Sequence, residues 1–129
     1  MKTPENADGH DRMVFRVARH LKQRYYRDVR ASVRGFPAPE PVSSASAPVT
    51  ADVTMVTKLD QLNLFAVETA GTIGERAREE WTALAEHADR CGGRFRVVVP
   101  RGSRGSAERQ LQEFGLTAGV WEFGPTRGG

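Results

Sequence analysis

The sequence predicts a single α/β domain whose central mixed sheet of about five strands is flanked by helices. The chain has 129 residues, enough for one hydrophobic core but short for two. Segments with helical periodicity alternate with short strand-like segments. A predicted hairpin is followed by a helix and a buried strand, an order typical of helices packed on a mixed sheet. We expect the domain to span residues 10–123, between a disordered leader at 1–9 and a flexible tail at 124–129.

The first helix is predicted from about His10 to Tyr25. Apolar residues recur along it at helical spacing, at Val14, Val17, Leu21 and Tyr25. Residues 28–34 then alternate between apolar and polar side chains, which indicates a half-buried strand. Residues 35–50 contain four prolines and no periodicity, so we expect an extended surface loop.

A β-hairpin is predicted from strands at 51–57 and 63–69, joined by the short polar connection between them. The next helix begins with Thr72 and Glu75, spaced as in a capping box. Its apolar positions follow at helical spacing and are Ala77, Trp81, Leu84, Ala88 and Cys91. Gly92 should end this helix, because glycine readily adopts left-handed backbone geometry.

The last third of the chain predicts a strand, a helix and a short closing strand. Residues 94–100 have a fully apolar centre, which indicates burial on both faces of the sheet. A helix should run from Ser103 or Ser106 to Phe114, and a strand should occupy residues 119–123. The connection from 69 to 94 is long enough for a right-handed parallel crossover.

Composition excludes several classes of protein. No run of eighteen apolar residues exists, and the N-terminus lacks the apolar region of a secretory signal, so we expect a cytoplasmic protein without a membrane span. A single cysteine, Cys91, excludes an internal disulfide and a zinc finger.

Charge is unevenly distributed along the chain. Residues 12–34 carry eight basic residues against one acid, whereas residues 51–91 carry four basic residues against eight acids. The basic stretch could neutralise phosphates of a nucleic acid, or it could be an ordinary solvated helix face.

Two acids are candidate metal ligands. Asp52 lies at the start of the first hairpin strand and Glu68 at the end of the second, so the hairpin should bring both carboxylates to one edge of the sheet. Converging carboxylates are the ligands that Mg²⁺ prefers. The alternative is that Asp52 is a strand-end acid and that Glu68 is an acid at a helix entry.

The predicted order αβββαβ, the acid that opens a hairpin strand and the apolar strand that ends in AVET (66–69) resemble the PD-(D/E)XK nuclease superfamily. The likeness is greatest to its small prokaryotic members whose third strand ends in E-V-E-T. It covers residues 10–123 and extends to RYYRDVRASVRGFPAPEPV (24–42), which is similar to their first strand and the loop after it. The resemblance implies a restriction endonuclease-like fold and Mg²⁺-dependent cleavage of phosphodiester bonds in DNA or RNA.

Carried over by this resemblance, Asp52 matches the metal-binding aspartate, with Ala51 where proline is usual. Glu68 matches one position of the acid-x-lysine pair, in which a second acid sometimes replaces the lysine. Two registers are open, because strand residues two apart share a face. Either Ala66 stands at the acid position, or Ala70 stands at the lysine position. Lys58, on the hairpin turn, could substitute only if its loop folds back.

A glycine- and serine-rich turn over residues 100–110 opens the last helix. Its backbone amides, with Arg101 and Arg104, could hold a phosphate; the alternative is a flexible loop with ordinary serine caps. We expect Arg101 and Arg104, together with Arg30 and Arg34, to contact the nucleic-acid backbone. His10 could approach the hairpin end, but we expect no catalytic role for it.

The leading hypothesis is therefore a Mg²⁺-dependent nuclease that uses Asp52 and Glu68. Its rival is an inactive protein of the same fold that binds nucleic acid, because the site lacks a third polar residue. A protein-interaction module that uses residues 35–50 is a further alternative. Whether the chain forms a homodimer is left open.

Overall fold

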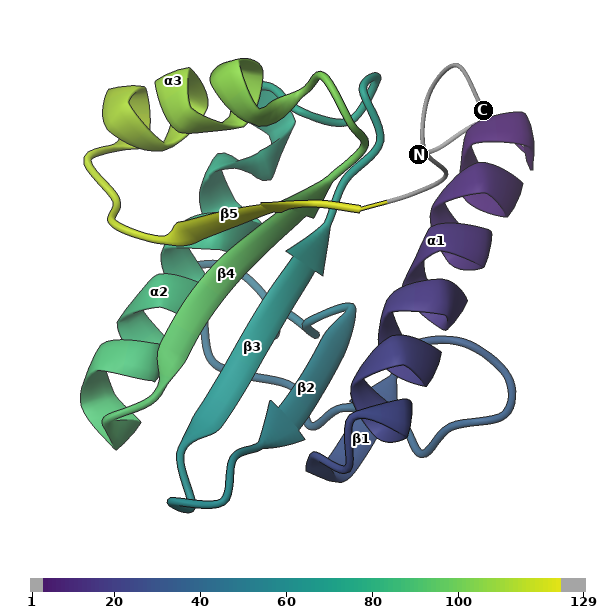
Figure 1. The fold of residues 1–129 in the computed structure, drawn as a ribbon. Helices are drawn as coiled ribbons and strands as arrows, with labels where there is room; N and C mark the ends of the chain where they lie inside the picture. Colours follow the sequence, from purple (N-terminus) through teal and green to yellow (C-terminus); the bar gives the residue numbers. More distant parts are fainter. Residues whose placement is uncertain (1–3, 124–129) are drawn as a thin grey trace.

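The computed structural model describes residues 4–123, with side chains from Gly9 onward, and shows three helices packed on one mixed sheet (Figure 1). The elements in chain order are α1 (Pro4–Gln23), β1 (Arg27–Ala31), β2 (Val53–Val56), β3 (Leu62–Val67), the 3-10 turn η1 (Glu75–Ala77), α2 (Arg78–Cys91), β4 (Arg94–Val99), α3 (Arg104–Phe114) and β5 (Gly119–Glu122). The predicted α/β class with a five-stranded mixed sheet is confirmed.

Spatial order in the sheet follows sequence order, β1-β2-β3-β4-β5. The predicted hairpin is confirmed, because β2 and β3 are antiparallel neighbours with Val53 opposite Phe65. β3 and β4 are parallel, as are β4 and β5. The start of β2 and the ends of β3, β4 and β5 therefore lie at one edge of the sheet, which we call the upper edge (Figure 1).

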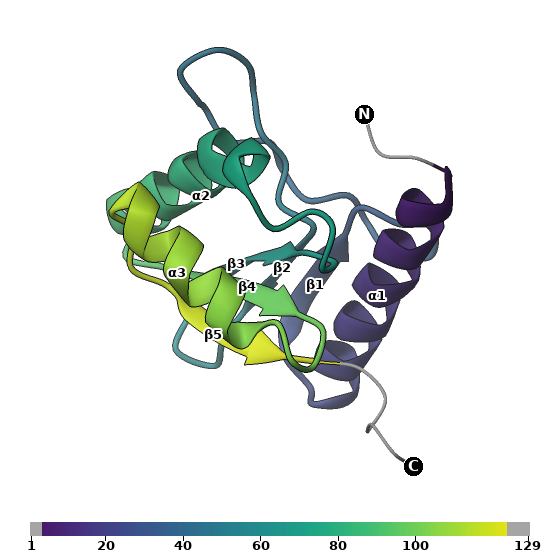
Figure 2. The ribbon, with the colours of Figure 1, turned by 90° about the horizontal axis from the view of Figure 1, so that it is seen from above.

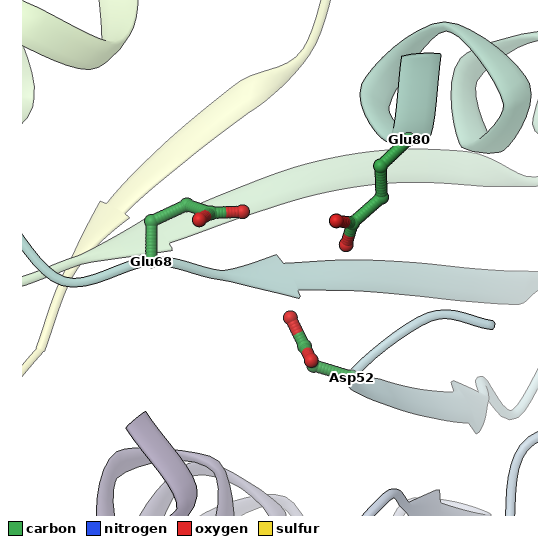
Figure 3. A group of neighbouring side chains, drawn as sticks. All are labelled: Asp52, Glu68 and Glu80. Carbon is green, nitrogen blue, oxygen red and sulfur yellow. The ribbon is translucent and has the colours of Figure 1, made fainter. Parts of the chain in front are cut away.

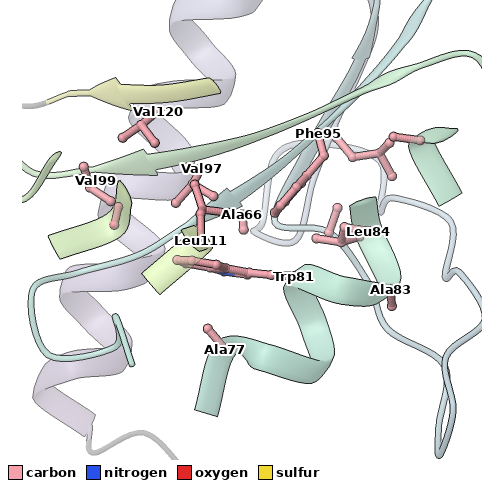
Figure 4. Close-up of a cluster of buried hydrophobic side chains, with 14 of the residues drawn as sticks. Ala66, Ala77, Trp81, Ala83, Leu84, Phe95, Val97, Val99, Leu111 and Val120 are labelled. Atoms are coloured by element: carbon pink, nitrogen blue, oxygen red, sulfur yellow. The ribbon is translucent and has the colours of Figure 1, made fainter. Parts of the chain in front are cut away.

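The sheet separates two layers of helices, with α1 on one face and α2 and α3 on the other (Figure 2). Alternating strand residues divide between the two cores: Phe65 and Val67 pack beneath α1, whereas Leu64 and Ala66 pack beneath α2. Trp81 is fully buried at the centre of the second core (Figure 4). Because side chains alternate between the two faces, a residue that follows directly after β3 points toward either α1 or α2 according to its position.

Several predicted boundaries shift. α1 begins at Pro4, so the leader predicted at 1–9 overlaps the helix from residue 4, and it ends at Gln23 rather than Tyr25. Residues 1–3 and the tail predicted at 124–129 lie outside the described part of the chain. β1 ends at Ala31 instead of residue 34, because the chain turns over residues 32–36, where the Ala31 amide donates to the Pro37 carbonyl.

The predicted capping box is wrong. The Thr72 hydroxyl oxygen accepts a hydrogen bond from the Thr69 amide at 2.8 Å, while Glu75 accepts hydrogen bonds from Arg78. A 3-10 turn precedes α2, and no side chain caps either helix start. The predicted stop is confirmed, since Gly92 adopts a left-handed conformation with φ of 71°.

The proline-rich loop is anchored at its centre. Val42 and Val49 pair by mutual backbone hydrogen bonds, and Val42 is buried against the α2 core. Ser44 and Ser46 donate hydrogen bonds to Glu79 on α2. Those two bonds hold the pKa of Glu79 below its ordinary value, because they stabilise its charged form. This segment therefore packs on the same side of the sheet as α2.

Candidate metal centre

Asp52 is placed at the upper edge by the hairpin. Its amide donates to the Phe65 carbonyl at 3.0 Å, which keeps it in register with β3 although β2 begins one residue later. The Val67 amide donates to Asp52 Oδ2 at 2.7 Å. His10 Nε2, from α1, lies 3.2 Å from Asp52 Oδ1, and the Asp52 side chain is 13% exposed. The carboxylate is thus held between the sheet and α1.

Glu68 follows β3 directly and extends its pairing with β4, since its amide donates to the Val98 carbonyl at 2.8 Å. Strand alternation directs its side chain to the α2 face, the same face as Ala66. There Trp81 Nε1 donates a hydrogen bond to Glu68 Oε2 at 3.0 Å. Glu68 is only 4% exposed, so its carboxylate occupies a nearly water-free position.

A third acid, Glu80, completes the group. Asp52, Glu68 and Glu80 each offer an oxygen, and these oxygens all lie within 4.8 Å of one another. Figure 3 shows the three carboxylates converging from β2, β3 and α2. We call these three residues the acidic cluster. The expected convergence of Asp52 with Glu68 is therefore found, with one more ligand than the sequence indicated.

Glu80 was missed because it lies outside the hairpin. A usable signal was present, since Glu80 is three residues after Ala77, buried at the end of η1, and four before Leu84, buried on α2. It therefore borders the stripe that faces the sheet. The short connection from β3 to α2 places the first turn of this helix near the end of β3, where Glu68 lies. Combining these two facts requires knowing how the helix packs.

The acidic cluster could hold a metal ion. Carboxylate oxygens are the ligands of hard divalent cations. Two oxygens on one Mg²⁺ are at most about 4.2 Å apart, and two on one Ca²⁺ are at most about 5 Å apart. The observed spread of up to 4.8 Å needs at most a small adjustment of the glutamate side chains. Three carboxylates within this distance also repel one another unless a cation or protons lie between them.

Ala66 and Ala70, which stand at the acid and the lysine position of the two possible registers, have no side-chain atom that could bind a metal ion. Ala66 is fully buried in the α2 core, and Ala70 is exposed beyond β3. Lys58 lies in the turn between β2 and β3, at the opposite end of the hairpin from Asp52 and Glu68, so its loop does not fold back to the cluster. The third acidic side chain instead comes from α2.

The four arginines predicted to bind nucleic acid come from two parts of the fold, Arg30 and Arg34 on or after β1 and Arg101 and Arg104 between the end of β4 and the start of α3. Arg30 pairs with Asp28 at 3.0 Å, donates to the Ala38 carbonyl and lines a groove with Glu40 and His87, away from the acidic cluster. Arg34 is exposed after β1. Arg101 is exposed after β4, at the upper edge. Their contacts with nucleic acid stay predictions.

The fourth, Arg104, begins α3 directly after the loop at residues 100–103, and Glu122 occupies the place predicted for a phosphate. The Gly102 amide donates to Glu122 Oε2 at 2.6 Å, and Arg104 Nε lies 3.7 Å from Glu122 Oε1. Arg104 also lies 4.0 Å from Glu108, one turn along α3. A carboxylate of the chain itself thus meets the amide and the guanidinium expected to hold an anion.

None of the helices in the described part of the chain combines the length and hydropathy that a transmembrane helix needs. Comparison with family models, with curated proteins and with solved structures finds no match to this chain.

Proposed function

We propose that this protein is a metal-dependent phosphodiesterase that cleaves nucleic acid. The observation that carries the proposal is the convergence of Asp52, Glu68 and Glu80 at one edge of a sheet with the αβββαβ order. This is the edge at which the PD-(D/E)XK resemblance puts the metal site. A bound divalent cation supplies Lewis acidity toward a phosphoryl oxygen and lowers the pKa of a bound water.

The residues of the chain would divide the work. Asp52, held by the Val67 amide, and Glu68, held by Trp81, offer ligands in fixed orientations. Glu80 adds the ligand that neither alanine register supplies. Burial of Glu68 excludes water from one side of the site, which strengthens its attraction for a cation.

Nucleic acid is the favoured substrate because of the charge around the site. The chain has a net charge of +3 and a pI near 9.5. The solvent face of α1 carries exposed arginines, at positions 12, 16 and 19. This helix also contributes His10, the neighbour of Asp52, so the basic face and the acidic cluster share an element. A polyanion drawn to that face arrives beside the cluster.

A second candidate is a protein that binds nucleic acid and a metal without cleaving. It is favoured by the position of Lys58, which puts the ammonium group expected to assist water activation at the far end of the hairpin. The interaction module based on residues 35–50 is less favoured, because the centre of that loop is anchored to α2 and to the core.

The test is cleavage of labelled single- and double-stranded DNA and RNA in Mg²⁺ or Mn²⁺, with EDTA as the blank. Asp52→Asn and Glu80→Gln should each lower the rate at least about a hundredfold, because each removes a ligand charge. Glu86→Gln is the matched control, since Glu86 is exposed on the same helix as Glu80.

Three outcomes separate the candidates. Cleavage that needs metal, Asp52 and Glu80 supports the phosphodiesterase. Salt-sensitive binding of nucleic acid without cleavage supports the binding protein, because contacts to phosphates weaken as counterions compete. Cleavage that Asp52→Asn leaves unchanged overturns this site.

A further inference from the structure

Among the residues of α1 whose side chains are described, from Gly9 onward, His10 is the first buried one, and it is polar among apolar residues. The buried face of the helix consists of His10, Val14, Val17, Ala18 and Leu21, of which only the first has a polar side chain. His10 is 6% exposed, as buried as many core residues. A polar group in such a position costs free energy unless it makes a polar contact.

The imidazole lies between two carboxylates. Nε2 lies 3.2 Å from Asp52 Oδ1, and Nδ1 lies 3.3 Å from Asp11 Oδ1. Nε2 is shielded from solvent, and its contact with Asp52 is close but not aligned as a hydrogen bond. Water therefore cannot easily take its place beside Asp52.

Asp52 is consequently approached from two sides. Its Oδ2 accepts the Val67 amide at 2.7 Å, while its Oδ1 faces His10 Nε2. A donor on each oxygen fixes the rotation of a carboxylate, so a proton on Nε2 would complete the arrangement that the Val67 amide begins. The lone pairs that remain can then be directed at a cation shared with Glu68 and Glu80.

We propose that His10 is a positioning residue, which donates from Nε2 to Asp52 Oδ1 and so orients Asp52 as a metal ligand. The inference rests on the proposed metal site and adds to it a residue from α1. Partners that orient ligands in this way raise metal affinity because the ligand geometry is set before the ion binds.

The proposal specifies which side-chain nitrogen must donate, so it can be tested with amide side chains of two lengths. In glutamine, the amide nitrogen lies about as far along the side chain as Nε2 of histidine, whereas in asparagine it corresponds to Nδ1. His10→Gln can therefore still donate toward Asp52, and His10→Asn cannot. The two variants are both polar amides, so they form a matched pair that differs in reach.

The experiment is an isothermal calorimetry titration of the purified protein with Mn²⁺ alone. It compares wild type with His10→Gln and His10→Asn. We expect His10→Asn to bind Mn²⁺ about 10–100-fold more weakly and His10→Gln to restore most of the affinity. Thermal unfolding in EDTA accompanies each titration, so that a loss of affinity is read only on folded protein. If His10→Asn does not fold, His10→Ala carries the same test, because alanine favours the helix and removes the donor.

The outcomes keep this inference apart from the proposed function. Tight binding by wild type, with equal binding by His10→Asn or His10→Ala, overturns the positioning role and leaves the metal site standing. Absence of Mn²⁺ binding by folded wild type overturns the metal site and, with it, this inference. Weak binding by both His10→Gln and His10→Asn contradicts positioning through Nε2, because the donor would then not be what matters.

Discussion

The acidic cluster and the loop between β4 and α3, residues 100–103, lie at the same edge of the sheet but differ in how their charges are matched. In the loop, the Gly102 amide and Arg104 meet the carboxylate of Glu122. In the cluster, three carboxylates converge, Asp52 accepts a hydrogen bond from the Val67 amide and lies beside His10, and Glu68 accepts a hydrogen bond from Trp81.

The difference separates a place where a carboxylate of the chain meets an amide and a guanidinium from a place where three carboxylates converge on one another. The loop could have received a phosphate, but β5 ends with an acid that supplies the anion from within the chain. In the acidic cluster, acids from just before β2, just after β3 and the first turn of α2 offer oxygens within 4.8 Å of one another. A glycine- and arginine-rich motif therefore indicates an anion site only when the fold brings no acid of the chain itself to that place.

The largest expected effect comes from adding a fourth acid to the cluster from within β3. Ala66→Glu should lower the free energy of unfolding by about 3–5 kcal/mol, because Ala66 is fully buried and a carboxylate there would have no partner charge. Urea denaturation measures this. Ala70→Lys is the control, since Ala70 is exposed and should change stability by less than about 0.5 kcal/mol. A normally stable Ala66→Glu protein would show that the β3 register has room for an acid.

Metal-dependent stabilisation is the next effect in size. A cation at a hundred times its dissociation constant should raise the free energy of unfolding of wild type by about 2.7 kcal/mol. Asp52→Asn should lose most of this gain yet fold normally without metal, because the asparagine oxygen can still accept the Val67 amide. Denaturation with and without Mn²⁺ measures it. An equal gain in Asp52→Asn would place the ion elsewhere.

A smaller effect should follow from Glu122→Gln, which removes the charge that closes the loop. Stability should fall by about 1 kcal/mol, because the hydrogen bond from Gly102 weakens and Arg104 loses its partner. Mn²⁺ affinity should stay the same, since Glu122 is not part of the cluster. The same denaturation and calorimetry test both statements. Weaker Mn²⁺ binding by Glu122→Gln would show that the two regions are coupled.

The smallest effect concerns Glu75, an exposed acid at the start of α2. Hydrogen bonds from Arg78 hold the pKa of Glu75 below its ordinary value of 4.5. The contribution of this pair to stability is therefore complete above that ordinary value and is lost as the pH falls through the lowered pKa. Glu75→Gln should weaken the pH dependence of the free energy of unfolding only in this acid range. At neutral pH the free energy of unfolding should change little, because exposed ion pairs contribute little. A clear loss at neutral pH would contradict this.

Much of the architecture could be predicted from periodicity. The two amphipathic helices, the hairpin and the buried strand each carry a local pattern, and their order implies helices on both faces of the sheet. The convergence of Asp52 and Glu68 was predictable for the same reason, because an antiparallel hairpin places the start of one strand beside the end of the next. The capping box failed since Thr72 found a nearer partner in Thr69.

The sequence by itself determined the elements, their order and the two acids on the hairpin, since all of these depend on neighbours close along the chain. Only the tertiary structure decided which other residues join them. Glu80 and His10 reach the site from helices on opposite faces of the sheet, and Glu122 reaches Gly102 from the next strand. Such contacts depend on how helices and strands pack against one another, and local periodicity carries no information about that packing.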